Sequence, residues 1–301
     1  MSRYAACHGV MCCYPQEMAM CSRGGYCYIP RHTSQLLLKP PYHVLVLGRC
    51  FRDSFILAAA IKPTSCLYSV VVLLITLEKM RFLCLHGWGT NSSIFETQTA
   101  AIRFELGDRH TYEFVEGHLP SEMFPDLREV TSNMDEFFSY ADIKDIGSCL
   151  KALDLLDAYV AAEGPFDGIL AFSQGAIIGA SYLVWKMHTA PESKPPIMPF
   201  KCAIFFSAPA AFDFRALKNG EFRALTRDVD GELIQIPTAH IWGLNDTTID
   251  AFTVSGLGAP DKTELYVHDG KHEVPGVRMK DAVKSSVQII RRVIEMASVR
   301  G

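Results

Sequence analysis

The sequence has no dense cluster of basic residues, which removes the usual basis for nucleic-acid binding. Its formal net charge is −4 at pH 7, whereas nucleic-acid-binding proteins gain much of their affinity from lysine and arginine side chains that face phosphates. It also has no uninterrupted apolar run of about twenty residues, the length that a membrane-spanning helix needs. The clean run at 66–77 is only twelve residues long. We therefore expect a small-molecule partner, and neither a nucleic acid nor a membrane.

Cysteine is sparse after residue 80, and this argues against a disulfide framework. Seven of the ten cysteines fall before that point, and only Cys84, Cys149 and Cys202 follow it. Scattered free thiols are typical of a reducing compartment, so we expect a cytoplasmic protein. The amino-terminal cysteines lack the paired C-x-x-C spacing of a zinc site, and no G-x-x-x-x-G-K phosphate loop occurs, so no metal and no cofactor are expected.

The amino-terminal part differs in composition from the rest. Residues 1–79 carry eight lysine and arginine residues against three acids, a net charge of +5, which leaves −9 for residues 80–301. We predict that 1–79 form a poorly structured extension that is not part of the mature protein, with translation beginning at Met80 and a folded domain at 80–301. Two alternatives stay open, namely a genuine but poorly ordered extension and a membrane anchor around 66–77.

After Met80, short apolar runs alternate with segments of helical periodicity. Apolar runs bounded by glycine or proline predict buried strands, and apolar spacings of three and four predict helices. The expected strands are 81–86, 111–115, 166–172, 202–206, 236–242 and 264–268. The expected helices are 92–106, 146 to an end at Gly164, 174–188 and 277–297. This alternation predicts an α/β fold with a mostly parallel sheet that is covered by helices on both faces.

A long connection at 117–142 interrupts this alternation. It contains two prolines and a cluster of aromatic residues: Phe124, Phe137, Phe138 and Tyr140. Long connections in compact domains usually have a function. We predict a lid or a pocket wall here, and a packed surface excursion is the alternative.

The most informative local pattern lies at 164–176, where the sequence reads G-P-F-D-G-I-L-A-F-S-Q-G-A. It predicts a buried strand, a sharp turn at Ser173 and a helix. A strand that turns directly into a helix pushes the corner side chain outward, and close packing there needs small neighbours. Ala171 and Gly175 supply them, giving A-x-S-x-G where G-x-S-x-G is the commoner form. Ser173 is therefore the predicted nucleophile, and a plain helix-capping serine is the alternative.

A serine nucleophile needs a general base, and the base needs an orienting acid. In parallel α/β domains, catalytic groups lie on loops beyond the carboxyl ends of strands. Two successive loops of this kind present Asp246 and His272. The chain order Ser173, Asp246, His272 is the order that α/β-hydrolases use. The alternative acids and bases are Asp250, Asp269, His268 and His240.

Acyl transfer also needs hydrogen-bond donors for the oxyanion that forms in the transition state. The backbone N–H of Gln174, at the amino end of its helix, is one candidate. The other is the backbone N–H of Trp88 in the loop after the first strand, because Gly87 and Gly89 on either side of it allow close approach of a substrate.

Five ordered motifs resemble those of the fungal serine hydrolase (FSH) family of α/β-hydrolases. They read RFLCLHGWGTNSSIF, EGPFDGILAFSQGA, FKCAIFFS, PTAHIWGLND and DGKHEVPG. The resemblance covers essentially Met80 to the end and implies an α/β-hydrolase catalytic domain at 80–301. By the same resemblance, Ser173, Asp246 and His272 carry over as nucleophile, acid and base. Two departures stand out, because Ala171 replaces a common glycine and residues 1–79 have no counterpart.

Within that family, the chain looks most like the esterases and thioesterases that accompany fungal polyketide synthases. The resemblance implies hydrolysis of an ester or thioester of a hydrophobic acyl chain through an acyl-enzyme, in polyketide or other secondary metabolism. The acyl group would be free or held on a carrier domain of the synthase. A non-catalytic protein that binds or chaperones a polyketide intermediate on the same fold is the alternative.

Overall fold

The computed structural model describes residues 54–61, 69–76, 79–127, 136–189, 198–249 and 254–298. The chain divides into two units, Met1–Leu77 and Glu78–Gly301.

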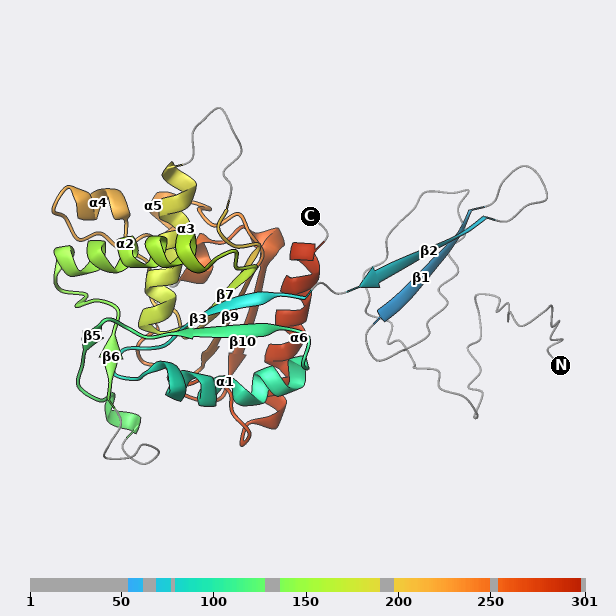
Figure 1. The fold of residues 1–301 in the computed structure, drawn as a ribbon, viewed down its shortest axis with the longest axis horizontal. Helices are drawn as coiled ribbons and strands as arrows, with labels where there is room; N and C mark the ends of the chain where they lie inside the picture. The colour runs from blue at the N-terminus through green and yellow to red at the C-terminus, as the bar shows by residue number, and fades with distance from the viewer. Residues whose placement is uncertain are drawn as a thin grey trace. The chain divides into compact units, whose positions relative to one another are not determined.

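In the first unit, the described residues form an antiparallel hairpin of β1 (Ser54–Ile61) and β2 (Ser69–Thr76) (Figure 1). The aliphatic and β-branched residues of both segments favour strands, and the interruption of the apolar sequence at Lys62 falls between them. The hairpin was not expected from the sequence, and the rest of the predicted extension lies outside the described residues. In the described ranges, no helix has the length and apolar character needed to cross a membrane.

The second unit contains a six-stranded sheet in the order β10-β9-β8-β7-β3-β4. Every neighbouring pair is parallel, and the predicted α/β-hydrolase fold is confirmed. The strands are β3 (Arg81–Leu85), β4 (Thr111–Val115), β7 (Gly168–Phe172), β8 (Cys202–Phe206), β9 (Thr238–Gly243) and β10 (Thr263–His268). The chain runs from β3 outward to β4, then returns to β7 on the other side of β3. Such a reversal marks the part of a parallel sheet where ligands bind.

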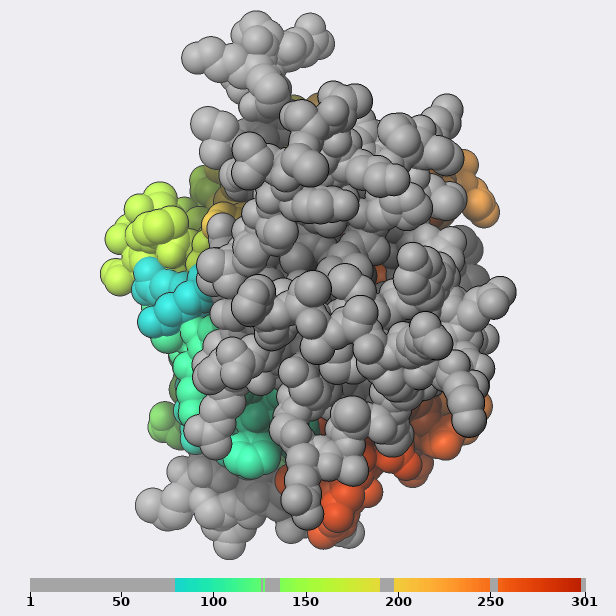
Figure 2. Space-filling view, turned by 90° about the vertical axis from the view of Figure 1, so that its right-hand side faces the viewer, coloured from blue at the N-terminus to red at the C-terminus, as the bar shows by residue number. Residues whose placement is uncertain are grey.

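Helices cover both faces of this sheet (Figure 1). The helices α1 (Ser92–Leu106) and α6 (Lys280–Ser298) pack on one face, and α2 (Ile146–Glu163) and α3 (Gln174–Thr189) pack on the other. The helices α1 and α6 also contact each other. Teal and red surfaces are both visible in the lower part of the space-filling view (Figure 2).

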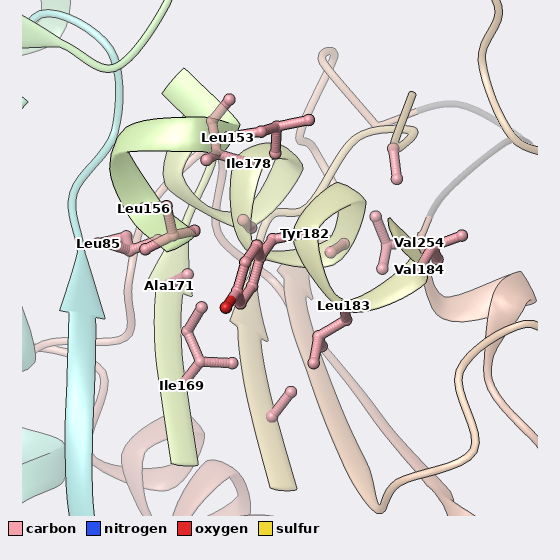
Figure 3. Close-up of a cluster of buried hydrophobic side chains, with 14 of the residues drawn as sticks. Leu85, Leu153, Leu156, Ile169, Ala171, Ile178, Tyr182, Leu183, Val184 and Val254 are labelled. Carbon is pink, nitrogen blue, oxygen red and sulfur yellow. The ribbon is translucent and has the colours of Figure 1, made fainter. Parts of the chain in front are cut away.

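Side chains of the central strands β3, β7 and β8 alternate between two cores. On β3, Leu83 faces α2 and α3, whereas Cys84 faces α1 and α6, as the two-residue period of a strand requires. Figure 3 shows the first core, in which Tyr182 of α3 lies near Ile178 and Ala171. The buried Tyr182 hydroxyl donates to Asp157 Oδ1 at 2.8 Å, so this core holds no unpaired phenol.

Most predicted elements agree with the structure within a few residues. The predicted helix 92–106 and strands 111–115 and 202–206 coincide with α1, β4 and β8. Helix α1 begins where the Asn91 side chain accepts a hydrogen bond from Ile94 N–H and ends at Gly107, whose φ of 87° terminates the helix. The last helix begins at Lys280 rather than 277, because Gly276 to Met279 form a turn.

The polar stretch at 213–232 contains two short helices that the sequence analysis did not predict, α4 (Phe214–Lys218) and α5 (Arg227–Asp230). Asp213 caps the first of them by accepting from Arg215 N–H at 2.8 Å. Arg223 joins the two, because its guanidinium contacts both Asp213 and Asp230. The 3₁₀ helices η2 (Val254–Leu257) and η3 (Pro260–Lys262) then lead into β10.

The described part of the connection at 117–142 contains the two-residue strands β5 (Leu119–Pro120) and β6 (Phe138–Ser139), and the 3₁₀ helix η1 (Pro125–Leu127). The strands pair in antiparallel fashion. Backbone hydrogen bonds join this segment to the loop after β3: Gly89 N–H donates to Phe138 O at 3.1 Å and Phe124 N–H donates to Gly89 O at 2.9 Å. The segment is therefore attached to the sheet edge where the predicted site residues lie.

Candidate active site

Ser173 stands at the turn between β7 and α3, with its backbone in the left-handed region at φ 52°. Its N–H donates to Phe206 O of the neighbouring strand at 3.0 Å. Space at this turn is very limited, since a Cβ on Gly175 would lie 2.5 Å from the carbonyl oxygens of both Leu85 and His86. The glycine of the A-x-S-x-G pattern is thus required by close backbone packing, and the strained turn exposes the Ser173 side chain.

The structure brings together Ser173, His272 and Asp246, which lie far apart in the sequence. Ser173 Oγ is 2.8 Å from His272 Nε2, and His272 Nδ1 is 2.8 Å from Asp246 Oδ2. A carboxylate can only accept, so Nδ1 carries the proton and Nε2 is free to accept from the serine hydroxyl. This is the arrangement that a serine–histidine–aspartate triad requires.

The Asp246 side chain is fully buried, yet it is held in the ionised form. Burial by itself raises the pKa of a carboxyl group. In Asp246, hydrogen bonds from His272 and from Thr248 outweigh burial and lower the pKa well below its ordinary range. Thr248 supplies two of these bonds to Oδ1, from its hydroxyl at 2.7 Å and from its backbone N–H at 2.9 Å.

Backbone and side-chain hydrogen bonds hold the loop that carries Asp246 against the loop that carries His272. Asn245 Nδ2 donates to Asp269 O at 2.8 Å, and Asn245 N–H donates to Gly270 O at 3.0 Å. A Cβ on Gly243 would lie 2.2 Å from Lys271 O, so only glycine allows this approach. Sequence reasoning missed the role of Asn245, because an asparagine after a strand is most often a turn residue.

The alternative bases and acids do not reach Ser173 in the described part of the chain. His240 lies inside β9, fully buried beside Phe205, and both of its ring nitrogens lack a partner among the described residues. His268 uses Nδ1 to accept from Gly270 N–H at 3.1 Å. Asp269 contributes its backbone carbonyl to the loop contact above. Asp250 lies outside the described residues.

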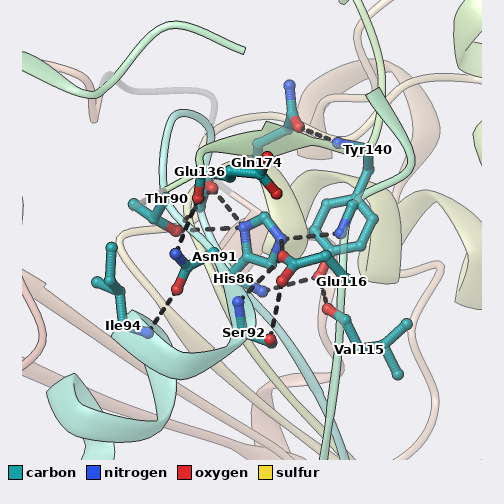
Figure 4. Close-up of polar contacts among 12 residues, drawn as sticks. His86, Thr90, Asn91, Ser92, Ile94, Val115, Glu116, Glu136, Tyr140 and Gln174 are labelled. Atoms are coloured by element: carbon teal, nitrogen blue, oxygen red, sulfur yellow. Dashed lines mark hydrogen bonds and ion pairs between the residues drawn. The ribbon is translucent and has the colours of Figure 1, made fainter. Parts of the chain in front are cut away.

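His86 fixes the orientation of the peptide between Gly87 and Trp88 (Figure 4). The buried His86 ring donates from Nδ1 to Gly87 O at 2.7 Å, and the Thr90 hydroxyl donates to the same oxygen at 3.0 Å. In a trans peptide the N–H points opposite to the C=O, so the Trp88 N–H points away from His86. Among the described residues, neither this N–H nor that of Gln174 donates to a protein acceptor.

Further contacts hold the His86 ring in place. Gly117 N–H donates to Nε2 at 2.9 Å, and Glu116 Oε1 lies at the same distance from that nitrogen. Burial raises the pKa of Glu116, but its polar contacts with His86 and the hydrogen bonds that Ser92 donates to it outweigh burial and lower the pKa overall. The loop after β3 is therefore held by side chains that the sequence motif alone did not reveal.

The Gln174 side chain connects the Ser173 turn to the segment at 136–142. Its Oε1 accepts from Tyr140 N–H at 2.8 Å, and its Nε2 donates to Ala141 O at 2.8 Å (Figure 4). The Tyr140 hydroxyl in turn donates to Val115 O at 2.7 Å and accepts from His86 N–H at 3.0 Å. The sequence suggested only a backbone role for Gln174, and no sequence signal marks its amide contacts.

A cavity of about 280 Å³ opens beside Ser173. Its apolar wall consists of Trp88, Phe124, Leu127 and Phe172, and Gln98, Thr248, Lys271 and Glu273 are polar residues that also line it. The Phe172 and Phe124 rings lie 4.9 and 5.9 Å from the His272 ring. The described part of 117–142 thus forms a pocket wall.

In the ranges that the structure describes, no group of three or more His, Cys, Asp or Glu residues could hold a metal ion.

Comparison with known proteins finds esterases among the similar sequences. Esterase FPY3 of Fusarium mangiferae is 37% identical over 224 residues, which cover 73% of this chain and 99% of that protein. A probable esterase of Aspergillus terreus is 30% identical over 230 residues, covering 69% of this chain and 87% of that one. The crystal structure of Arabidopsis thaliana SOBER1 matches at a TM-score of 0.46 and 14% identity, over 72% of this chain and 99% of that one.

A profile of the serine hydrolase (FSH1) family matches residues 75–283. This match confirms the resemblance seen in the five motifs. The parallel α/β sheet and the esterase relatives support the same family. The chain belongs to the FSH1 serine hydrolase family, and it is a serine esterase.

Proposed function

We propose that the chain hydrolyses its substrate through an acyl-enzyme on Ser173. The observation that carries the proposal is the continuous hydrogen-bonded chain from Ser173 Oγ through both nitrogens of His272 to Asp246. A serine hydroxyl is a weak nucleophile by itself, and a base at hydrogen-bond distance removes its proton as it attacks. Asp246 holds the imidazole in the required tautomer and stabilises the imidazolium that forms.

In the first half-reaction, Ser173 Oγ attacks the carbonyl carbon while His272 Nε2 takes the hydroxyl proton. The bond from that carbon to the leaving oxygen or sulfur then breaks, and the leaving group takes the proton from Nε2. In the second half-reaction, a water molecule attacks the acyl carbon and gives a proton to Nε2. The acid is released, and the proton returns to Ser173 Oγ.

Two backbone N–H groups are proposed to bind the oxyanion, those of Trp88 and Gln174. Both lie next to Ser173 in the fold, one on the loop that lines the cavity and one at the first residue of α3. The support for Trp88 is the fixed orientation of its peptide, whose carbonyl is held by His86 and Thr90. Donors that are already oriented stabilise the developing charge without reorganisation.

The proposed substrate is an ester or thioester of a hydrophobic acyl group, in fungal polyketide or other secondary metabolism. The aromatic wall of the cavity supports an apolar acyl group, and its volume of about 280 Å³ is near the lower end of ligand pockets, which favours a short or compact one. The metabolic role rests on the motif resemblance to polyketide-associated esterases. We propose that the acyl group is either free or carried on a carrier domain of the synthase. The proposed location is the cytoplasm.

The test combines turnover with covalent labelling. For Ser173→Ala, we expect hydrolysis of p-nitrophenyl esters and acyl thioesters to fall by about 10³ to 10⁶-fold, and labelling by a fluorophosphonate to disappear. Ser207→Ala is the matched control, because Ser207 is a buried serine at the end of the neighbouring strand. Equal turnover by wild type and Ser173→Ala would refute the assignment. Absence of labelling in an inactive wild-type protein would favour the binding or chaperone alternative.

We also propose that residues 80–301 suffice for activity. The three side chains, the oxyanion loop and the cavity all belong to the unit Glu78–Gly301. A chain shortened to 80–301 should keep the kcat and the melting temperature of the full chain. If the shortened chain were insoluble or inactive while the full chain was soluble and active, the amino-terminal part would be structural.

A further inference from the structure

Thr248 contacts both partners of the acid–base pair, although nothing in the motif marks it. Its Oγ1 lies 2.7 Å from Asp246 Oδ1 and 2.8 Å from His272 Nδ1. We propose that the Thr248 hydroxyl is a positioning group, which orients the Asp246 carboxylate and gives His272 Nδ1–H a second acceptor. This inference rests on the proposed function of the three residues.

The donor and acceptor roles at this hydroxyl follow from its neighbours. An ionised carboxylate only accepts, so the Thr248 O–H donates to Asp246 Oδ1. The His272 Nδ1 proton then faces two acceptors, Asp246 Oδ2 at 2.8 Å and a lone pair of Thr248 Oγ1 at 2.8 Å. One hydroxyl therefore closes a ring of hydrogen bonds around the acid–base pair.

This ring has two physical consequences. With Oδ1 of Asp246 held by Thr248, rotation of the carboxylate is restricted and Oδ2 stays directed at the imidazole. In addition, an acceptor on Nδ1–H stabilises the imidazolium more than the neutral ring, because the protonated ring is the stronger donor. Thr248 thus favours the protonated His272 that forms when Ser173 gives up its proton.

The hydroxyl is not needed for the local turn. The backbone N–H of Thr248 already donates to Asp246 Oδ1 at 2.9 Å, which is the usual bond of an aspartate turn. A Thr248→Val substitution keeps this N–H and nearly the same side-chain shape, and removes only the hydroxyl. Thr248→Ser keeps the hydroxyl. The adjacent exposed Thr247 offers Thr247→Val as a matched control.

The experiment measures kcat, KM and the pH profile of kcat/KM for full-length wild type and these variants. A hydrogen bond to a charged group predicts a loss of about 10 to 100-fold in kcat for Thr248→Val, with KM nearly unchanged. The acidic limb of the profile should move to lower pH, because the imidazolium loses an acceptor. Thr248→Ser should restore most of the activity, and Thr247→Val should resemble wild type.

The charged groups around His272 in the described residues are few. Asp246 faces Nδ1 from the loop after β9, and Lys271 and Glu273 line the cavity from the loop of His272 itself. The neighbours from the other elements are uncharged, namely the Phe124 and Phe172 rings and Ser173. None of these groups changes in Thr248→Val, so a shift of the acidic limb reports the lost hydroxyl.

A double-mutant cycle separates positioning from substrate contact, since Thr248 also lines the cavity. If Thr248 acts through Asp246 and His272, Thr248→Val should have less than about a twofold effect in a His272→Ala background, because both of its proposed contacts act on the His272 ring. An effect confined to KM would overturn the inference, as would unchanged kcat. If His272→Ala itself left turnover unchanged, the proposed function would fail, whereas a large His272→Ala effect with none for Thr248→Val would refute only this inference.

Discussion

Ser173 and Ser207 stand at the carboxyl ends of neighbouring parallel strands, β7 and β8, and both have left-handed backbone, with φ values of 52° and 43°. Their side chains lie in different surroundings. Ser173 Oγ is hydrogen-bonded to His272 and borders the cavity. Ser207 is completely buried, and its Oγ has no partner among the described residues. A strained serine at the end of a strand is therefore not by itself a nucleophile.

The same contrast separates two histidines. His272 lies on a loop and uses both ring nitrogens, toward Ser173 and Asp246. His240 lies inside β9 with both nitrogens buried and unpaired in the described structure. Loop position, access and a partner distinguish the proposed catalytic set, whereas residue type and strand position do not.

The largest effect is expected from Asp246→Asn. This substitution removes the carboxylate partner that distinguishes His272 from His240. Because the amide cannot hold Nδ1–H as a carboxylate does, the wrong tautomer is favoured, and we expect kcat to fall by about 10⁴-fold. Steady-state kinetics on a p-nitrophenyl ester test this expectation. Asp269→Asn is the control, and a loss of less than tenfold in Asp246→Asn would contradict the proposed role.

Gly175→Ala should disturb the Ser173 turn itself. The added methyl would lie 2.5 Å from two backbone oxygens, so the turn must shift, and a displacement near 1 Å can cost about 100-fold in kcat. Gly179 lies on the same helix, but a methyl group there would come closest to the end of the flexible Ile169 side chain. Gly179→Ala should therefore reduce kcat much less. Equal kcat values for the two variants would show that the tight turn is not needed.

His240 should make the domain sensitive to acid. Burial lowers its pKa from an ordinary 6.5 to about 3. Between these pH values the unfolded chain binds a proton that the folded chain excludes, so the free energy of unfolding falls as the pH falls, by up to about 1.4 kcal/mol per pH unit.

In His240→Leu this contribution is absent, because leucine does not titrate. Urea unfolding of both proteins at pH 7 and pH 4 should show a smaller loss of stability in the variant. Other titrating groups are shared and cancel in the comparison. An identical loss in both proteins would mean that His240 is already protonated in the folded state.

Ser207→Gly is expected to stabilise the domain modestly. Glycine adopts the left-handed backbone without strain, and the substitution also removes a buried unpaired hydroxyl. We expect a gain of about 1 kcal/mol, or roughly 2–4 °C in melting temperature, with unchanged kcat. Ser207→Ala, which keeps the strain and loses only the hydroxyl, should gain less. A destabilised Ser207→Gly would indicate that this hydroxyl has a partner in solution.

The order of strands and helices could be predicted because each element carries its own periodic pattern, as in 92–106 and 202–206. The neighbourhood of Ser173, Asp246 and His272 followed from a rule on parallel sheets, in which successive strand ends meet at one edge. Their catalytic roles remain the proposal made above. The hairpin of β1 and β2 was missed because its apolar residues show no alternation.

The contacts that support the site could not be predicted in this way. Thr248, Asn245 and the Gln174 amide act through partners on other segments, and each residue type is ordinary at its position in the sequence. In the described part of 117–142, Phe124 and Phe138 make backbone hydrogen bonds to Gly89 and Thr90. Backbone bonds of this kind leave no trace in residue identity, so only the folded structure shows them.

Gly89 has a consequence for protein engineering. Both of its backbone groups bond to the pocket wall, it has a φ of 67°, and a Cβ there would lie 2.6 Å from Phe124 N. The loop at 86–90 and the described part of the wall are therefore joined through their backbones. A graft of the wall from a relative should bring the loop at 86–90 with it, whereas libraries at Phe124 and Leu127 can vary the pocket surface while leaving these backbone bonds in place.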